Sequence, residues 1–176
     1  MKVYRAVIVC ICIFFASAFG FLLVRTTYPR PYAEEIQKSG LPSALVYAVI
    51  KAESSFREDA VSRAGAVGLM QIRPATAEFI CTRQGIAFES ARLKEGSYNI
   101  SVGCMYLKYL IERFAALETA LAAYNAGEGK VRSWLKNSDF SADGIVLRKI
   151  PYPETEEYIK KVAKFRKNYE IFYGKT

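Results

Sequence analysis

The chain has 176 residues, with 25 lysines and arginines against 17 acidic residues and no histidine, so its formal charge is +8. The lack of histidine excludes Ser-His-Asp and Cys-His nucleophile systems and HExxH zinc sites, and no glycine-rich nucleotide-binding pattern occurs, so we expect no cofactor. A basic surface suits an anionic polymer or a membrane, whereas no recognition motif supports a nucleic acid partner.

The N-terminal segment is strongly apolar. Residues 6–24 form a run of nineteen whose only clearly polar side chain is Ser17, and as a helix this run would span roughly 28 Å, close to the hydrocarbon core of a bilayer. Lys2 and Arg5 precede it, which places the N-terminus on the cytoplasmic side. A small-x-small sequence at residues 16–18 also fits a cleaved signal peptide. Because the apolar run continues beyond it, we favour an uncleaved, single-pass transmembrane anchor over residues 1–25.

Either interpretation exports the remainder of the chain, so we expect the rest of it on the extracytoplasmic side of the cell membrane. Residues 26–40 contain two prolines and mixed charges, as is typical of a linker. A single domain over residues 41–176 follows, and its length is sufficient for a buried core.

The first helix of that domain leads to a glutamate. Pro42 suits a first helical turn, and apolar residues at 46, 49 and 50 define one helical face whose next position is Glu53. A carboxyl group on a buried face is desolvated, which raises its pKa and allows it to act as a general acid near neutral pH. The alternative is an ordinary solvated glutamate at a helix end.

Helical spacing continues through the rest of the domain. It predicts helices from Pro74 to a C-cap at Gly85, from Ser97 to Phe114, over the sequence LETALAAY, over residues 131–136 and after Pro153, with a loop at 137–144. No alternating apolar pattern of useful length occurs, so we expect an all-α fold, or an α fold with a small β element. Cys81 and Cys104 lie on neighbouring predicted helices, and either a disulfide or two buried free thiols fits their pattern.

Four sequence blocks resemble the lytic transglycosylases of the soluble-lytic-transglycosylase type. They are Glu53-Ser54 with Ser62 nine residues after the glutamate, the Gly-Leu-Met-Gln sequence ending at Gln71, Ala123-Tyr124-Asn125-Ala126-Gly127, and Ile150-Pro151-Tyr152-Pro153-Glu154-Thr155 leading to Tyr158. Together these blocks cover about 130 residues in the family's order, which makes the signal specific. The resemblance implies a lysozyme-like fold.

The resemblance also implies a reaction, cleavage of the β-1,4 bond between N-acetylmuramic acid and N-acetylglucosamine in peptidoglycan. Glu53 would act first as general acid and then as base, while the muramic acid 6-hydroxyl attacks its own anomeric carbon to give a 1,6-anhydro sugar. Tyr158 would steady charge beside Glu53. The residues expected to bind substrate are Ser62, Gln71, Tyr124, Asn125 and Glu154. We expect a monomer whose partners are peptidoglycan strands and the membrane.

Structural roles remain open for several of these residues. Ser62 could instead cap the Gly-Leu-Met-Gln turn, Glu154 could stabilise a helix N-terminus, and an amide at position 71 needs a partner in any apolar setting. Two other functions also remain. A hydrolytic muramidase on the same fold would need a second carboxylate, for which Glu58, Asp59 and Glu128 are candidates by position. A non-catalytic glycan-binding assembly factor would need none.

Overall fold

Helices form all of the regular secondary structure in the computed structural model, which describes residues 2–175. The helices are α1 (Lys2–Thr27), α2 (Ala33–Lys38), α3 (Ser43–Glu53), α4 (Pro74–Arg83), η1 (Ser90–Lys94, a 3-10 turn), α5 (Gly96–Arg113), α6 (Leu117–Ala126), α7 (Glu128–Leu135) and α8 (Pro153–Tyr173). Two isolated β-bridges join Val61 to Val67 and Val67 to Ile72. This confirms the α fold with a small β element.

The chain divides into two compact units, the first ending at Pro31 and the second beginning at Tyr32. The first unit is dominated by α1, in which the segment Cys10–Thr27 is long and apolar enough to cross a membrane. Length and composition are the basis of that statement, and a signal sequence near the N-terminus meets the same criteria.

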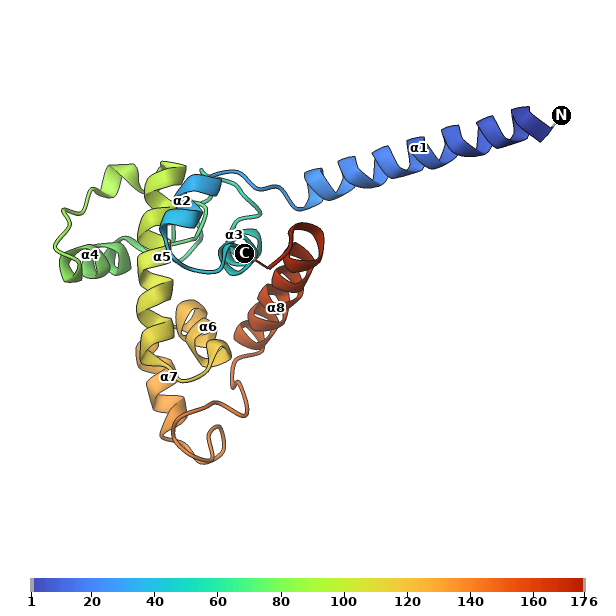
Figure 1. The fold of residues 1–176 in the computed structure, drawn as a ribbon. Coiled ribbons are helices and arrows are strands. Elements are labelled where there is room, and N and C mark those ends of the chain that lie inside the picture. Colours follow the sequence, from blue (N-terminus) through green and yellow to red (C-terminus); the bar gives the residue numbers. More distant parts are fainter. Residues whose placement is uncertain (1, 176) are drawn as a thin grey trace. The chain divides into compact units, whose positions relative to one another are not determined.

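The second unit is organised around α3. Seven consecutive residues of this helix, 44–50, are each at most 4% exposed, so the helix is buried on all sides. The long helix α8 packs along α3, and α6 packs on α8 and α5, while α5 also contacts α2 and α4 (Figure 1). The last residue of the central helix is Glu53.

The expected linker over residues 26–40 is wrong in its second half. Residues 33–38 form α2, whose Ile36 is fully buried, and α2 packs on α3 and α5. The domain therefore begins at Tyr32 and not at Leu41. A six-residue helix with a single apolar side chain carries too little periodicity to be distinguished from a polar loop.

The other expected helices occur close to their expected bounds, with two differences. Helix α7 begins at Glu128, three residues before the expected start, and the last residue of the expected apolar stripe on α8, Phe172, is 42% exposed. Cys81 and Cys104 are buried free thiols, so no disulfide joins them. The Cys104 sulfur lies 4.0 Å from the sulfur of Met70, which occupies the space beside it.

Candidate active site

Glu53 occupies the C-terminal end of the central helix and is half-buried. Burial of the carboxyl raises its pKa from 4.5 to about 7, against a smaller lowering by a hydrogen-bonding interaction with the Tyr158 hydroxyl. A helix C-terminus is also an unfavourable place for a negative charge. Glu53 can therefore hold or release a proton near neutral pH, which a general acid and base requires.

The chain reverses immediately after this carboxyl. Ser54 caps α3 through its backbone N–H, which donates to the Ile50 carbonyl at 3.0 Å. Ser55 and Phe56 then adopt left-handed conformations with φ of 51° and 67°. Left-handed backbone is unfavourable for residues with a side chain, and two in succession end the helix sharply. Helix α3 therefore ends at Glu53, whose side chain is part of the cleft lining.

The cleft beside Glu53 has a volume of about 700 Å³. Its lining comes from the end of α3 and the segment after it, from the start of α4, from the middle of α5, from the junction of α6 and α7, and from the start of α8. Six residues expected to act at the site are part of this lining: Glu53, Ser62, Gln71, Tyr124, Asn125 and Glu154. The sequence therefore predicted residues that the fold brings together from four separate segments.

Tyr158 interacts with the Glu53 carboxyl but is not part of the cleft lining. Its hydroxyl is buried, and among the described residues no partner meets strict hydrogen-bond geometry with it. The groups that act on the hydroxyl electrostatically are Glu53 and Tyr124, and burial raises the Tyr158 pKa well above 10. The hydroxyl therefore stays protonated and can donate toward the Glu53 carboxylate once that group ionises.

A tight turn over residues 60–72 forms one wall of the cleft. The Ser62 hydroxyl accepts a hydrogen bond from the Ala66 N–H at 3.0 Å, and Gln71, with φ of 48°, donates through its side-chain nitrogen to the carbonyls of Ala60 (3.0 Å) and Gly68 (2.9 Å). Ser62 thus caps a turn over residues 62–66, and not the Gly-Leu-Met-Gln turn that was the expected alternative. Gln71 uses both amide hydrogens within the turn, and its side-chain oxygen is the atom left to face a ligand.

Asn99 on α5 holds this turn against the rest of the domain. Its side chain is fully buried, accepts from the Met70 N–H at 2.8 Å, and donates to the carbonyls of Val67 (2.9 Å) and Leu93 (2.8 Å). Sequence reasoning missed this residue. The available signal was an amide beside Ile100 on a predicted helix, where a buried polar group requires partners.

Tyr124 and Asn125 connect the cleft to two other elements. The Tyr124 hydroxyl donates to the Met70 carbonyl at 2.8 Å, so this tyrosine joins α6 to the turn over residues 60–72. The Thr155 hydroxyl donates to the Asn125 side-chain oxygen at 2.8 Å and joins α6 to α8. The amide nitrogen of Asn125 remains available to the cleft. Glu154 is exposed in the first turn of α8.

The candidates for a second carboxylate do not line the cleft. Glu58 and Asp59 are exposed, and Glu58 accepts a hydrogen bond from the Tyr32 hydroxyl. Burial would raise the pKa of Glu128, but hydrogen bonds, chiefly from Arg132 and the Tyr109 hydroxyl, outweigh burial and lower it. The second acidic residue in the lining of the cleft is Glu154.

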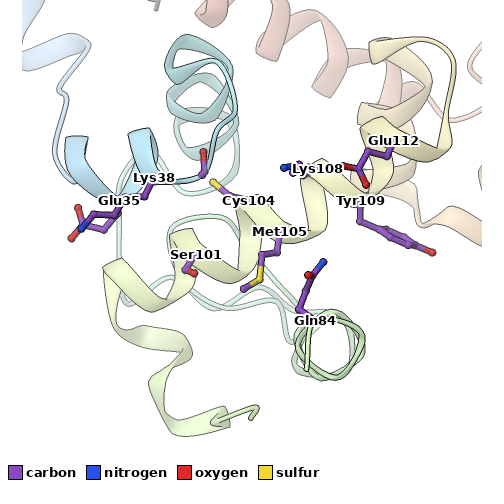
Figure 2. Close-up of a pocket in the computed structure, with 10 residues that line it drawn as sticks. Glu35, Lys38, Gln84, Ser101, Cys104, Met105, Lys108, Tyr109 and Glu112 are labelled. Atoms are coloured by element: carbon purple, nitrogen blue, oxygen red, sulfur yellow. The ribbon is translucent and has the colours of Figure 1, made fainter. Parts of the chain in front are cut away.

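A separate pocket of about 400 Å³ lies on α5, with α2 and the end of α4 at its sides (Figure 2). Cys104 is part of its lining, but burial raises the pKa of this thiol to about 12, against a lowering by Ser39. A thiol with such a pKa is not a nucleophile near neutral pH. The Cys104 thiol therefore gives this pocket no nucleophile.

Comparison with known proteins gives a consistent result. The family model described as the transglycosylase SLT domain matches residues 30–146. The soluble lytic murein transglycosylase of Escherichia coli K12 is 36% identical over 138 residues, which cover 76% of this chain and 21% of that protein. Membrane-bound lytic murein transglycosylase C of Haemophilus ducreyi is 29% identical over 170 residues, which cover 83% of this chain and 46% of that protein.

The fold is also similar to a solved structure. The 70 kDa soluble lytic transglycosylase SLT70 of Escherichia coli superposes with a TM-score of 0.75 at 32% identity, covering 86% of this chain and 26% of that one. The chain thus spans about a fifth to a half of the length of these relatives. The similarity confirms the lysozyme-like fold.

Proposed function

Because the chain belongs to the transglycosylase SLT family, we propose that its second unit is a peptidoglycan lytic transglycosylase domain that uses Glu53 as its catalytic residue. The observation that carries the proposal is the Glu53 carboxyl, whose pKa burial raises to about 7, at the edge of a cleft of about 700 Å³. Four residues of the cleft also fit recognition of a polar sugar chain, namely Gln71, Asn125, Glu154 and Tyr152.

The reaction needs one carboxyl in two states. Protonated Glu53 donates its proton to the oxygen of the β-1,4 bond, and that bond breaks as the N-acetylglucosamine unit leaves. The resulting carboxylate takes the proton of the muramic acid 6-hydroxyl, whose oxygen then bonds to the anomeric carbon of the same ring. Glu53 ends protonated, the product is a 1,6-anhydro sugar, and no water is consumed. A second carboxylate is unnecessary in this scheme.

Tyr158 assists through the protonation state of Glu53. Its hydroxyl is buried beside the carboxyl and stays protonated across the pH range of interest. As Glu53 gives up its proton, the hydroxyl can donate to the new carboxylate, and a hydrogen bond to the charged form stabilises it. The Ser62 hydroxyl accepts from Ala66 and the Tyr124 hydroxyl donates to Met70, so both residues help to shape the cleft, and each hydroxyl keeps further hydrogen-bonding capacity for a sugar. Asn125 and Glu154 are the better candidates for direct sugar contact.

Product analysis separates this reaction from its rivals. The wild-type protein, incubated with purified peptidoglycan, should release fragments ending in 1,6-anhydro-N-acetylmuramic acid, which are lighter by one water than hydrolysis products. The Glu53→Gln variant should retain strand binding and lose activity by at least about 10²–10⁴-fold, the usual worth of general acid–base catalysis. Reducing ends that appear in step with cleavage would show hydrolysis, and undiminished binding without wild-type turnover would show a non-catalytic glycan-binding protein.

We further propose that α1 anchors this domain to the cell membrane and leaves it on the extracytoplasmic side. The supporting observation is the apolar segment Cys10–Thr27, preceded by Lys2 and Arg5. The protein should remain in the membrane fraction through a carbonate wash, with its domain open to protease added from outside. A soluble mature form that begins near Phe19 would identify a signal peptide instead.

A further inference from the structure

The cleft carries more positive charge than its acid–base chemistry requires. Arg63, Arg73 and Lys130 are exposed residues of its lining, and no ion pair joins any of the three to an acidic group among the described residues. The acidic lining residues are Glu53, which is partly protonated near neutral pH, and Glu154. The open cleft therefore has an excess of cations.

These cations come from separate segments of the cleft lining. Arg63 belongs to the turn that the Ser62 hydroxyl caps, and Arg73 immediately precedes Pro74 at the start of α4. Lys130 belongs to α7, more than fifty residues after both arginines in the sequence. Positive charge that separate segments bring to the lining of one cleft favours an anionic ligand there.

The position of Lys130 is also constrained. Its ammonium lies 4.8 Å from the centroid of the Tyr152 ring, and Tyr152 packs edge-on against Trp134 with ring centroids 5.0 Å apart. Trp134 is itself buried in α7. A cation over an aromatic face keeps its charge and loses little of its ability to attract an anion. The ammonium is thus held at the rim of the cleft.

We propose that Arg63, Arg73 and Lys130 select glycan strands that carry carboxylates on their muramic acid residues. This inference rests on the proposed function and specifies its substrate. Two sources of carboxylate exist on such a strand. A stem peptide supplies its own carboxylates when it is attached through the lactyl group, and the lactyl carboxylate is free when the peptide has been removed. Neutral chitin oligosaccharides have neither.

Binding can be measured without turnover in a Glu53→Gln background. The test protein carries Arg63→Gln, Arg73→Gln and Lys130→Gln together. The control carries Lys136→Gln, Lys161→Gln and Lys164→Gln, which change three exposed residues outside the cleft and alter net charge equally. The probes are peptide-bearing strands, strands stripped by an amidase, and chitin oligosaccharides. Turnover by the wild-type protein, measured in parallel, tests the proposed function separately.

The expected result is a dissociation constant on the order of 10-fold weaker for the cleft variant with at least one carboxylate-bearing strand, because each exposed charge pair is typically worth up to about 5-fold. The loss should shrink as salt is raised from about 0.01 M to 1 M. Loss with peptide-bearing strands assigns the stem-peptide carboxylates, and loss with stripped strands assigns the lactyl carboxylate. Equal loss with chitin, equal loss in the control, or no loss with any probe would overturn the proposal.

Discussion

Glu53→Gln should make the protein more stable at alkaline pH while it removes activity. The pKa of Glu53 is raised in the folded state from 4.5 to about 7 by burial. Between these values the folded protein holds a proton that the unfolded chain has lost, so the free energy of unfolding falls as pH rises through that window. At 1.36 kcal/mol per pH unit, the full loss is about 3 kcal/mol above pH 7. A neutral glutamine avoids this loss.

The measurement is urea unfolding of the full chain in detergent, followed by the fluorescence of Trp134, the single tryptophan. At about pH 4 the wild type and variant should differ least, since Glu53 is then protonated in the folded protein and mostly protonated in the unfolded chain, whereas at about pH 8.5 the variant should be more stable by about 3 kcal/mol. Glu78→Gln, at an exposed position on α4, is the matched control and should show no pH-dependent gap. A stability gap for Glu53→Gln that stays constant with pH, or that reverses, would refute the reasoning.

Three other variants and measurements test the surroundings of the site. Tyr158→Phe should leave stability nearly unchanged, because the buried hydroxyl has no partner of good geometry among the described residues. It should shift the alkaline limb of the pH–activity profile to higher pH, because the hydroxyl lowers the pKa of Glu53, and an unmoved limb would contradict this. Asn99→Ala removes three hydrogen bonds and takes the side-chain partner from two buried backbone groups, the Met70 N–H and the Leu93 carbonyl, so it should cost about 3 kcal/mol in urea unfolding. A cost below about 0.5 kcal/mol would show that Asn99 does not hold the turn over residues 60–72. Non-reducing peptide mapping should find Cys81 and Cys104 on separate peptides, and a linked pair would disprove the free thiols.

The sequence predicted the helices that have long apolar stripes and the residues that belong to spaced blocks. Glu53 could be singled out because it interrupts such a stripe at a position where burial is expected. The short helix α2 could not be predicted, because its single buried side chain, Ile36, gives no helical spacing of apolar residues. Side-chain contacts between segments distant in the sequence could not be predicted either. Asn99 matters through the Met70 backbone 29 residues away, and nothing in its local pattern specifies that partner.

The cations of the cleft lining could not be predicted from the sequence either. Arg63, Arg73 and Lys130 are ordinary surface residues in the sequence, where 25 basic residues offer many combinations. Whether a cation is paired, and whether it borders a cleft, depends on the positions of acidic side chains throughout the fold. Only the assembled domain distinguishes these three from cations that form ion pairs, such as Arg113 and Arg132 with Glu128.

The packing of α8 along α3 bears on the order of events during synthesis. Glu53 ends α3 and α8 begins a hundred residues later, at Pro153, so the two helices meet through a contact of high sequence separation, which tends to form late in folding. If α1 stays in the membrane as proposed, the chain that follows it is exported in sequence order, so Glu53 reaches the extracytoplasmic side before the residues of α8. In that unfolded chain the glutamate is solvated and ionised at neutral pH, and it has no proton to donate. If the domain acts as proposed, it should therefore become able to cleave peptidoglycan only after α8 has packed along α3. Precursors that lack α8 should be inactive.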